Sequence, residues 1–213
     1  MTSGMTKTKL ASALLTLLLL LPTLASGEEN HSTTWNTATL LNLLATVTSR
    51  QSVFTEEKTL DYLEEPLVQK GTLYFTAPSQ LIKHITEPRE EVYTIIGANL
   101  KVEISGKPEQ LLRTDDHPIL HAFIESQRAV LAGDLNALEQ YYSLVLDGVR
   151  EQWTLQLHPK ESELSSRLKL ISIKGSGTEI LKMQIIEIGG DDTLLTFRSN
   201  KTSRKLKTSR AAR

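Results

Sequence analysis

The sequence contains no cysteine, and this absence removes several classes of structure and chemistry. No disulfide can stabilise the fold, so its stability has to come from burial of apolar surface. No cysteine can carry a lipid anchor, and no thiolate is available as a nucleophile or as a metal ligand. Any catalysis would therefore depend on hydroxyl, imidazole or carboxylate groups.

Aromatic residues and net charge are also scarce. Phe, Trp and Tyr make up 5% of the chain, and the formal net charge is -1. Proteins that bind nucleic acid combine an excess of positive charge with aromatic side chains on which bases stack. The composition therefore argues against nucleic acid as a partner.

The motifs that would support an enzyme are weak or absent. The sequence has no G-x-S-x-G elbow and no P-loop. His117 and His121 are four residues apart and could face one way to bind zinc, but no third ligand is evident beyond Asp115 or Asp116. Ordinary surface histidines next to a helix start explain the same residues, so we expect no metal site.

Four pairs of adjacent acids, at residues 56–57, 64–65, 90–91 and 191–192, could suggest general acid-base chemistry. All four pairs lie where strand ends or turns are expected, which predicts solvated side chains. We therefore expect a protein without enzymatic activity and without a cofactor.

The N-terminus has the three parts of a secretory signal peptide. Lys7 and Lys9 form a positive region, residues 10–21 are almost wholly apolar, and small residues follow at 25–27. The apolar run is about a dozen residues, whereas roughly 20 are needed to span a bilayer, so a permanent anchor is the weaker interpretation. We expect residues 1–27 to be removed and the mature protein to be soluble in the periplasm.

The C-terminus has a different composition. Residues 201–213 hold six basic side chains and one aliphatic side chain larger than alanine, Leu206. This predicts a disordered basic tail, which either is attracted to anionic lipid headgroups or is simply a solubilising terminus. The residues between the two ends, 28–200, are enough for a single domain with a hydrophobic core.

Hydrophobic periodicity predicts an α+β fold dominated by antiparallel strands. Apolar residues at helical spacing predict a first helix over residues 36–49. An extended stretch from Ser52 to a turn at 64–66 follows, and the further predicted strands are 67–76, 81–86, 91–96, 100–105, 141–146, 152–157, 168–174, 179–188 and 193–198. Short strands separated by turns, including one at Asp147-Gly148, indicate an antiparallel meander.

A second helix is predicted in the middle of the chain. Asp115 and Asp116 precede Pro118, which combines an aspartate cap with a proline in the first turn. An apolar stripe follows, and Gly133 ends the helix. Asp134 can then cap a short third helix through residue 138.

The segment 71–88, Gly-Thr-Leu-Tyr-Phe-Thr-Ala-Pro-Ser-Gln-Leu-Ile-Lys-His-Ile-Thr-Glu-Pro, resembles the core of the LolA-like outer-membrane lipoprotein carriers. In that family a glycine-led strand runs into a proline, and a leucine-bearing strand and a second proline follow. Further likenesses occur in order over residues 36–198: the turn at 97–99, the helix start at 115–118, the helix stop at 131–134, the segment 153–155 leading to Pro159, and the segment 190–193.

The resemblance implies an unclosed antiparallel β-barrel, or half-barrel, with a helical lid over an apolar cavity. It implies a monomeric carrier that takes a lipid or the acyl chains of a lipoprotein from an inner-membrane exporter and passes them to an outer-membrane acceptor. The lipid-binding side chains expected on this basis are Leu73, Phe75, Leu81, Ile85, Tyr93 and Ile95 from the strands, and Leu120, Phe123 and Ile124 from the lid helix. An ordinary filled core would produce the same alternation.

Two residues depart from the family pattern. Typical carriers have an arginine before the first proline that hydrogen-bonds the lid closed, and this chain has Ala77. They also have a tryptophan five residues after that proline, and this chain has Lys83. The resemblance therefore leaves open how the lid is held and whether the cargo is a lipoprotein or another lipid. The alternatives are a non-catalytic structural or adaptor domain of an envelope export complex and, less favoured, an envelope hydrolase.

Overall fold

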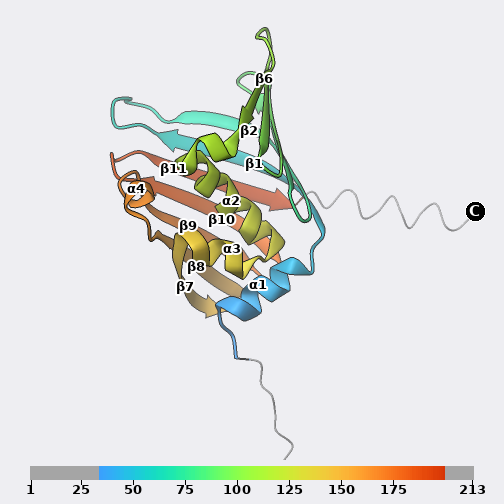
Figure 1. The fold of residues 1–213 in the computed structure, drawn as a ribbon, viewed down its shortest axis with the longest axis vertical. Helices are drawn as coiled ribbons and strands as arrows, with labels where there is room; N and C mark the ends of the chain where they lie inside the picture. Colours follow the sequence, from blue (N-terminus) through green and yellow to red (C-terminus); the bar gives the residue numbers. More distant parts are fainter. Residues whose placement is uncertain (1–33, 200–213) are drawn as a thin grey trace, which may run out of the picture. The chain divides into compact units, whose positions relative to one another are not determined.

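The structure is a computed structural model that describes residues 34–199. These residues form one antiparallel sheet of eleven strands with helices on one face (Figure 1). The elements in chain order are α1 (Thr37–Ala45), β1 (Ser49–Thr59), β2 (Leu67–Thr76), β3 (Gln80–Glu87), β4 (Glu91–Ile96), β5 (Asn99–Ile104), β6 (Gln110–Arg113), a 3-10 turn η1 (Thr114–Asp116), α2 (Pro118–Ala132), α3 (Leu135–Tyr141), β7 (Tyr142–Val149), β8 (Gln152–Pro159), α4 (Ser162–Ser165), β9 (Leu168–Ser176), β10 (Glu179–Glu187) and β11 (Asp192–Ser199).

The sheet consists of two meanders joined side by side. Its strand order is β6-β5-β4-β3-β2-β1-β11-β10-β9-β8-β7, so that β1 to β6 are consecutive neighbours in one half and β7 to β11 are consecutive neighbours in the other. The join is the pair β1 and β11, in which Phe54 lies opposite Phe197. Strands β6 and β7 are the two edges and do not pair with each other, which confirms the predicted unclosed antiparallel barrel.

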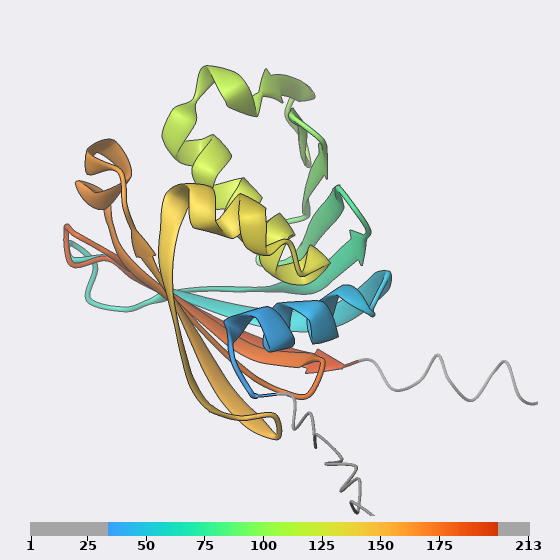
Figure 2. The same ribbon diagram turned by 60° about the horizontal axis from the view of Figure 1, so that its bottom comes forward.

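The helical lid is the connection between these two edges. After β6 the chain passes through η1, α2 and α3 before it enters β7, and these helices lie across the concave face of the curved sheet (Figure 2). Helix α1 packs beside α2, and its Leu40, Leu41 and Leu44 are fully buried. Alternate residues of the strands face the same interior, because side chains of a strand alternate between its two faces.

The first helix is shorter than its apolar spacing predicts. Asn36 caps α1 by accepting a hydrogen bond from the Thr39 backbone N–H (2.9 Å), and the helix ends at Ala45 instead of continuing to residue 49. The three residues that follow, 46–48, are all β-branched and lose side-chain freedom in a helix. Strand β1 begins directly after them.

The predicted aspartate cap of α2 is wrong. Asp115 and Asp116 belong to the 3-10 turn η1, and the N-cap residue is His117, whose side chain makes no capping hydrogen bond. Pro118 does occupy the first helical turn, as expected from its fixed φ. The cap of α3 is confirmed, because the Asp134 side chain accepts a hydrogen bond from the Ala137 backbone N–H (3.0 Å).

The turn predicted at Asp147-Gly148 lies three residues further on, at residues 150–151, so that Val149 and Gln152 still pair across the β7–β8 hairpin. Gly148 has φ +92 within β7, and a Cβ there would lie 2.2 Å from the Gln152 carbonyl oxygen. The glycine therefore allows the two strands to approach each other closely, and it does not form the turn itself. Strand β6 and helix α4 are too short to give a periodic signal and were not predicted.

Gly133 is the point where α2 ends and α1 contacts it. Its φ of +69 is left-handed, and its backbone N–H donates to the carbonyl of Val130. A Cβ at this position would lie 2.2 Å from the carbonyl oxygen of Leu41 and 2.7 Å from Ala45. Only glycine combines this backbone conformation with such close packing of two helices.

We expect Gly133→Ala to lower the free energy of unfolding by about 3 kcal/mol, because it adds left-handed strain and a clash with the α1 backbone. Urea titration would measure the loss. Gly97→Ala is the matched control, since Gly97 also has positive φ but has open space around its missing side chain. The control should lose only about 1 kcal/mol, and equal losses in the two variants would contradict the packing role of Gly133.

Candidate functional site

A large cavity lies between the concave face of the sheet and the lid. Its volume is about 900 Å³, and its lining side chains come from the central and N-terminal strands, from α2, and from β9 to β11. Most of these side chains are aliphatic or aromatic. The volume lies at the upper end of the range that is usual for small-molecule sites, about 300 to 1,000 Å³.

Seven of the nine side chains predicted to bind lipid line this cavity: Leu73, Leu81, Tyr93, Ile95, Leu120, Phe123 and Ile124. The other two, Phe75 and Ile85, are almost fully buried and do not line it. They lie on strands β2 and β3 as expected, but they are part of the packed core.

The part of the cavity wall that comes from the C-terminal meander was not predicted from the sequence. Met183, Ile185, Leu195 and Phe197 line the cavity from β10 and β11, and Phe54 lines it from β1. Alternation within each of these strands was visible in the sequence. What was not visible is the pairing of β1 with β11, which brings the last strand next to the first.

The mouth of the cavity is polar. Its exposed lining residues all belong to the start of α2 or to the segment around α4: Asp116, His117, Pro118, Glu163 and Arg167. The backbone carbonyl of Arg167 accepts a hydrogen bond from Ile188, which fixes this segment to the end of β10. The ion pair of Lys58 with Glu187 (3.9 Å) lies at the same end of the sheet.

Another ion pair of the cavity lies deeper, away from the mouth. The Lys83 ammonium on β3 donates a hydrogen bond to Oε2 of Glu56 on β1 (2.5 Å), and both residues line the cavity. The ammonium also lies 5.3 Å from the centroid of the Phe54 ring. The prediction that the paired acids are all solvated at strand ends or turns is therefore wrong for Glu56, which lies within β1 and is 12% exposed. It is also wrong for Glu91, which begins β4 but is buried.

A second polar chain runs along the start of β4. Glu91 is buried and accepts hydrogen bonds from Arg89 (2.7 Å) and from the Tyr93 hydroxyl (2.7 Å). The hydrogen bond from Arg89 and that from Tyr93 lower the pKa of Glu91, and burial together with the Glu91 carboxylate raises the pKa of Tyr93 to about 12. At neutral pH the Tyr93 hydroxyl is therefore protonated, and it already donates its hydrogen bond to Glu91.

Arg50 lines the end of the cavity opposite the mouth. Its Nη1 donates to the Thr178 carbonyl oxygen (2.5 Å), whereas the buried Nε and Nη2 have no hydrogen-bond partner among the described residues. Desolvation by burial lowers the pKa of this guanidinium, and nearby Glu179 partly opposes the effect. The deep end of the cavity thus carries a positive charge.

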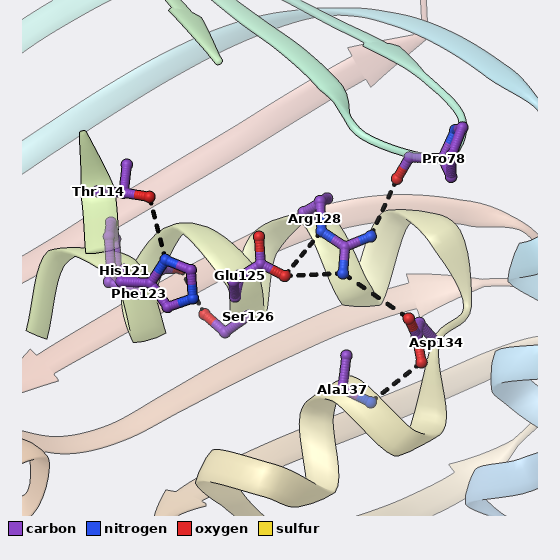
Figure 3. Close-up of polar contacts among 9 residues, drawn as sticks. All are labelled: Pro78, Thr114, His121, Phe123, Glu125, Ser126, Arg128, Asp134 and Ala137. Carbon is purple, nitrogen blue, oxygen red and sulfur yellow. Dashed lines mark hydrogen bonds and ion pairs between the residues drawn. The ribbon is translucent and has the colours of Figure 1, made fainter. Parts of the chain in front are cut away.

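The lid is attached to the sheet by Arg128 of α2 (Figure 3). Its guanidinium bonds Glu125 (2.7 Å), donates to the Pro78 carbonyl oxygen in the β2–β3 turn (3.0 Å) and lies 3.7 Å from Asp134. The hydrogen bond to Glu125 raises the pKa of Arg128 above its ordinary value. Although Ala77 offers no side-chain donor, the lid and this turn are therefore joined by an arginine on the lid side.

The two histidines considered as metal ligands have separate surroundings. His121 lies 3.0 Å from the Thr114 hydroxyl through Nδ1, whereas His117 is exposed at the helix start. Across residues 34–199 no group of three or more His, Cys, Asp or Glu side chains is placed to hold a metal ion.

A family model described as outer membrane lipoprotein carrier protein LolA-like matches residues 30–212. The chain belongs to this family. LolA-like proteins are proteins of the bacterial envelope that generally bind or carry ligands and do not catalyse reactions. No curated protein matches the chain significantly.

Solved structures with a similar fold include three bacterial proteins. The LolA superfamily protein NE2245 from Nitrosomonas europaea is 11% identical with a TM-score of 0.42, and the match covers 78% of this chain and 93% of the other. The MucA/MucB complex of Pseudomonas aeruginosa is 14% identical with a TM-score of 0.43, covering 76% of this chain and 55% of the other. A putative outer membrane lipoprotein-sorting protein domain from Vibrio parahaemolyticus is 12% identical with a TM-score of 0.38, covering 78% of this chain and 94% of the other. None of the helices in the described part of this LolA-like chain is long and apolar enough to cross a membrane. The predicted signal peptide and basic tail lie outside the described residues.

We expect Arg128→Met to lower the free energy of unfolding by about 2 kcal/mol, because it leaves Glu125 and the Pro78 carbonyl without their donor. Urea titration would measure the change. Arg113→Met is the control, since Arg113 pairs with Asp115 in an exposed position and such pairs contribute little. An equally small effect of both substitutions would show that Arg128 does not hold the lid to the sheet.

Proposed function

We propose that this protein is a periplasmic carrier that shields the acyl chains of a lipid or lipoprotein and passes them from the inner membrane towards the outer membrane. The observation that supports this proposal most directly is the apolar cavity of about 900 Å³ beneath the lid. A cavity of this size in a small domain is unusual, because protein interiors are normally packed with few voids larger than a water molecule.

The physical need for such a carrier follows from the cost of exposing hydrocarbon. Each methylene of an acyl chain that leaves an apolar environment costs about 0.8 kcal/mol, so a molecule with long chains cannot cross an aqueous compartment unaided. The leucine, isoleucine and phenylalanine side chains of the cavity provide an apolar surface without strong specific contacts. Moderate, non-directional binding also permits release at the acceptor.

The proposed route of transport is inferred from the sequence. The signal peptide over residues 1–27 directs export, and family membership supports a place in the envelope. Within this proposal an inner-membrane exporter is the donor, an outer-membrane component is the acceptor, and the protein acts as a monomer. The basic tail, 201–213, would lie close to anionic headgroups during exchange.

The cavity also bears on the alternatives. An adaptor domain with a filled barrel has no use for an open apolar interior, so the cavity favours the carrier. An envelope hydrolase needs converging polar groups beside its substrate. The polar side chains that line this cavity include the ion pair of Glu56 with Lys83, the occupied Tyr93 hydroxyl and Arg50. Among the described residues no hydrogen bond joins a serine or threonine of the lining to a histidine or carboxylate base, as an activated nucleophile requires.

The direct experiment is to purify the mature protein from its native periplasm without detergent and to identify bound molecules by mass spectrometry. A carrier should contain stoichiometric lipid or a lipidated protein. Protein that is consistently empty, and that does not take up a fluorescent fatty acid in vitro, would refute the proposed function.

We expect Phe123→Asp to weaken binding of a dansyl-labelled fatty acid roughly tenfold or more, because it places a charge against the acyl chain in the cavity. Fluorescence titration would measure the affinity. Leu181→Asp is the matched control, since Leu181 is exposed and lies outside the cavity, and it should bind the probe as the wild type does. Unchanged binding by a folded Phe123→Asp protein would contradict the role assigned to α2.

A further inference from the structure

The ion pair of Glu56 and Lys83 is out of place in a cavity meant only for hydrocarbon. The two side chains are 12% and 26% exposed, so both charges have lost much of their hydration. Attraction between the partners of a buried pair often fails to repay this loss, and well-packed apolar residues of the same size are as stable or more stable. The pair therefore needs an explanation beyond the stability of the fold.

The pair has hydrogen-bonding capacity that the described residues leave unused. The Lys83 ammonium has three donors, and its one hydrogen bond is to Oε2 of Glu56. The second carboxylate oxygen of Glu56 accepts no hydrogen bond within the described structure. Both residues line the cavity, so a donor and an acceptor face whatever occupies it. A purely hydrocarbon occupant would displace the remaining water and leave these groups unpaired, which is costly.

The position of the pair along the cavity matches the junction between the chains and the headgroup of an amphiphile. Lys58, at the mouth end, is opposite Thr193, and Glu56 lies one step deeper, opposite Leu195. Two residues along a strand correspond to about 7 Å. Beyond Glu56 the wall is apolar at Phe54, Leu195 and Phe197, and the next charged residue along β1 is Arg50 at the far end. A molecule whose chains fill the deep part of the cavity therefore places the junction between chains and headgroup beside the pair.

We propose that Glu56 and Lys83 bind the polar junction of the cargo, and that this junction carries a group that both donates and accepts a hydrogen bond, such as an amide or a hydroxyl. The inference rests on the proposed carrier function and specifies its substrate class. An amide or hydroxyl can accept from Lys83 and donate to the free oxygen of Glu56 while the ion pair stays intact. A simple ester only accepts, and an additional anionic group would compete with Glu56 for Lys83.

The test compares two ligands of equal chain length, the lauroyl amide of ethanolamine and methyl laurate. Their affinities are measured by displacement of a dansyl-labelled fatty acid. The ratio of the two affinities is compared between the wild type and the double variant Glu56→Met with Lys83→Met, which replaces both partners and leaves no unpaired charge. We expect the preference for the amide to fall roughly tenfold in the double variant, with methyl laurate bound at least as tightly as before.

The matched control is the double variant Lys70→Met with Glu87→Met. This pair has the same chemistry, joins β2 and β3 and lies in solvent outside the cavity, so its variant should keep the wild-type ratio. A folded cavity variant with the wild-type ratio would overturn the inference while leaving the carrier function intact. Failure of the wild type to bind either ligand would refute both.

A second measurement needs no substitution. The wild-type protein is titrated with the lauroyl amide of ethanolamine and with its N- and O-methylated form, which keeps the chain and the acceptors but has no donor. We expect the methylated form to bind several-fold more weakly, because Glu56 then lacks its donor. Equal affinity for the two amides would overturn the inference even if the double variant did not fold.

Discussion

The architecture depends on one topological constraint, which is that the chain leaves the sheet at one edge, β6, and returns at the other edge, β7. That single connection has to cross the concave face, and it does so as α2 and α3. A curved sheet of eleven strands offers more concave surface than two helices can cover, so a space remains beneath them. The cavity is therefore a consequence of connectivity and sheet width, and most of the side chains on both of its walls are apolar.

Local features of the fold could be predicted from the sequence, because they depend on neighbouring residues. The bounds of β4 and the cap at Asp134 follow from turn and capping chemistry within a few positions. Family resemblance supplied the unclosed barrel. The predictions that were wrong concern contacts between residues that are distant in the sequence. Nothing near Glu56 reveals that Lys83 lies within hydrogen-bonding distance on another strand, and nothing near Phe75 reveals that it is buried in the packed core and does not line the cavity.

The charged side chains that line the cavity lie at different distances from its mouth. The mouth carries side chains of both signs, the Glu56 and Lys83 pair lies one step inside, the middle of the cavity is apolar, and Arg50 marks the far end. Charged groups thus lie at both ends of the cavity, with an apolar region between them. Arg128, outside the cavity, connects the lid to the β2–β3 turn and therefore determines how firmly the apolar middle is covered.

The pairing of β1 with β11 has a consequence for how each molecule folds. These strands are the first and the last of the sheet, separated by about 140 residues of chain, and closing so large a loop makes their contact a late and slow event in folding. Neither meander has its central neighbour until residues 192–199 arrive. A chain that is threaded through a membrane from its N-terminus would thus remain incompletely folded during passage and would acquire its interior only after the final strand has emerged.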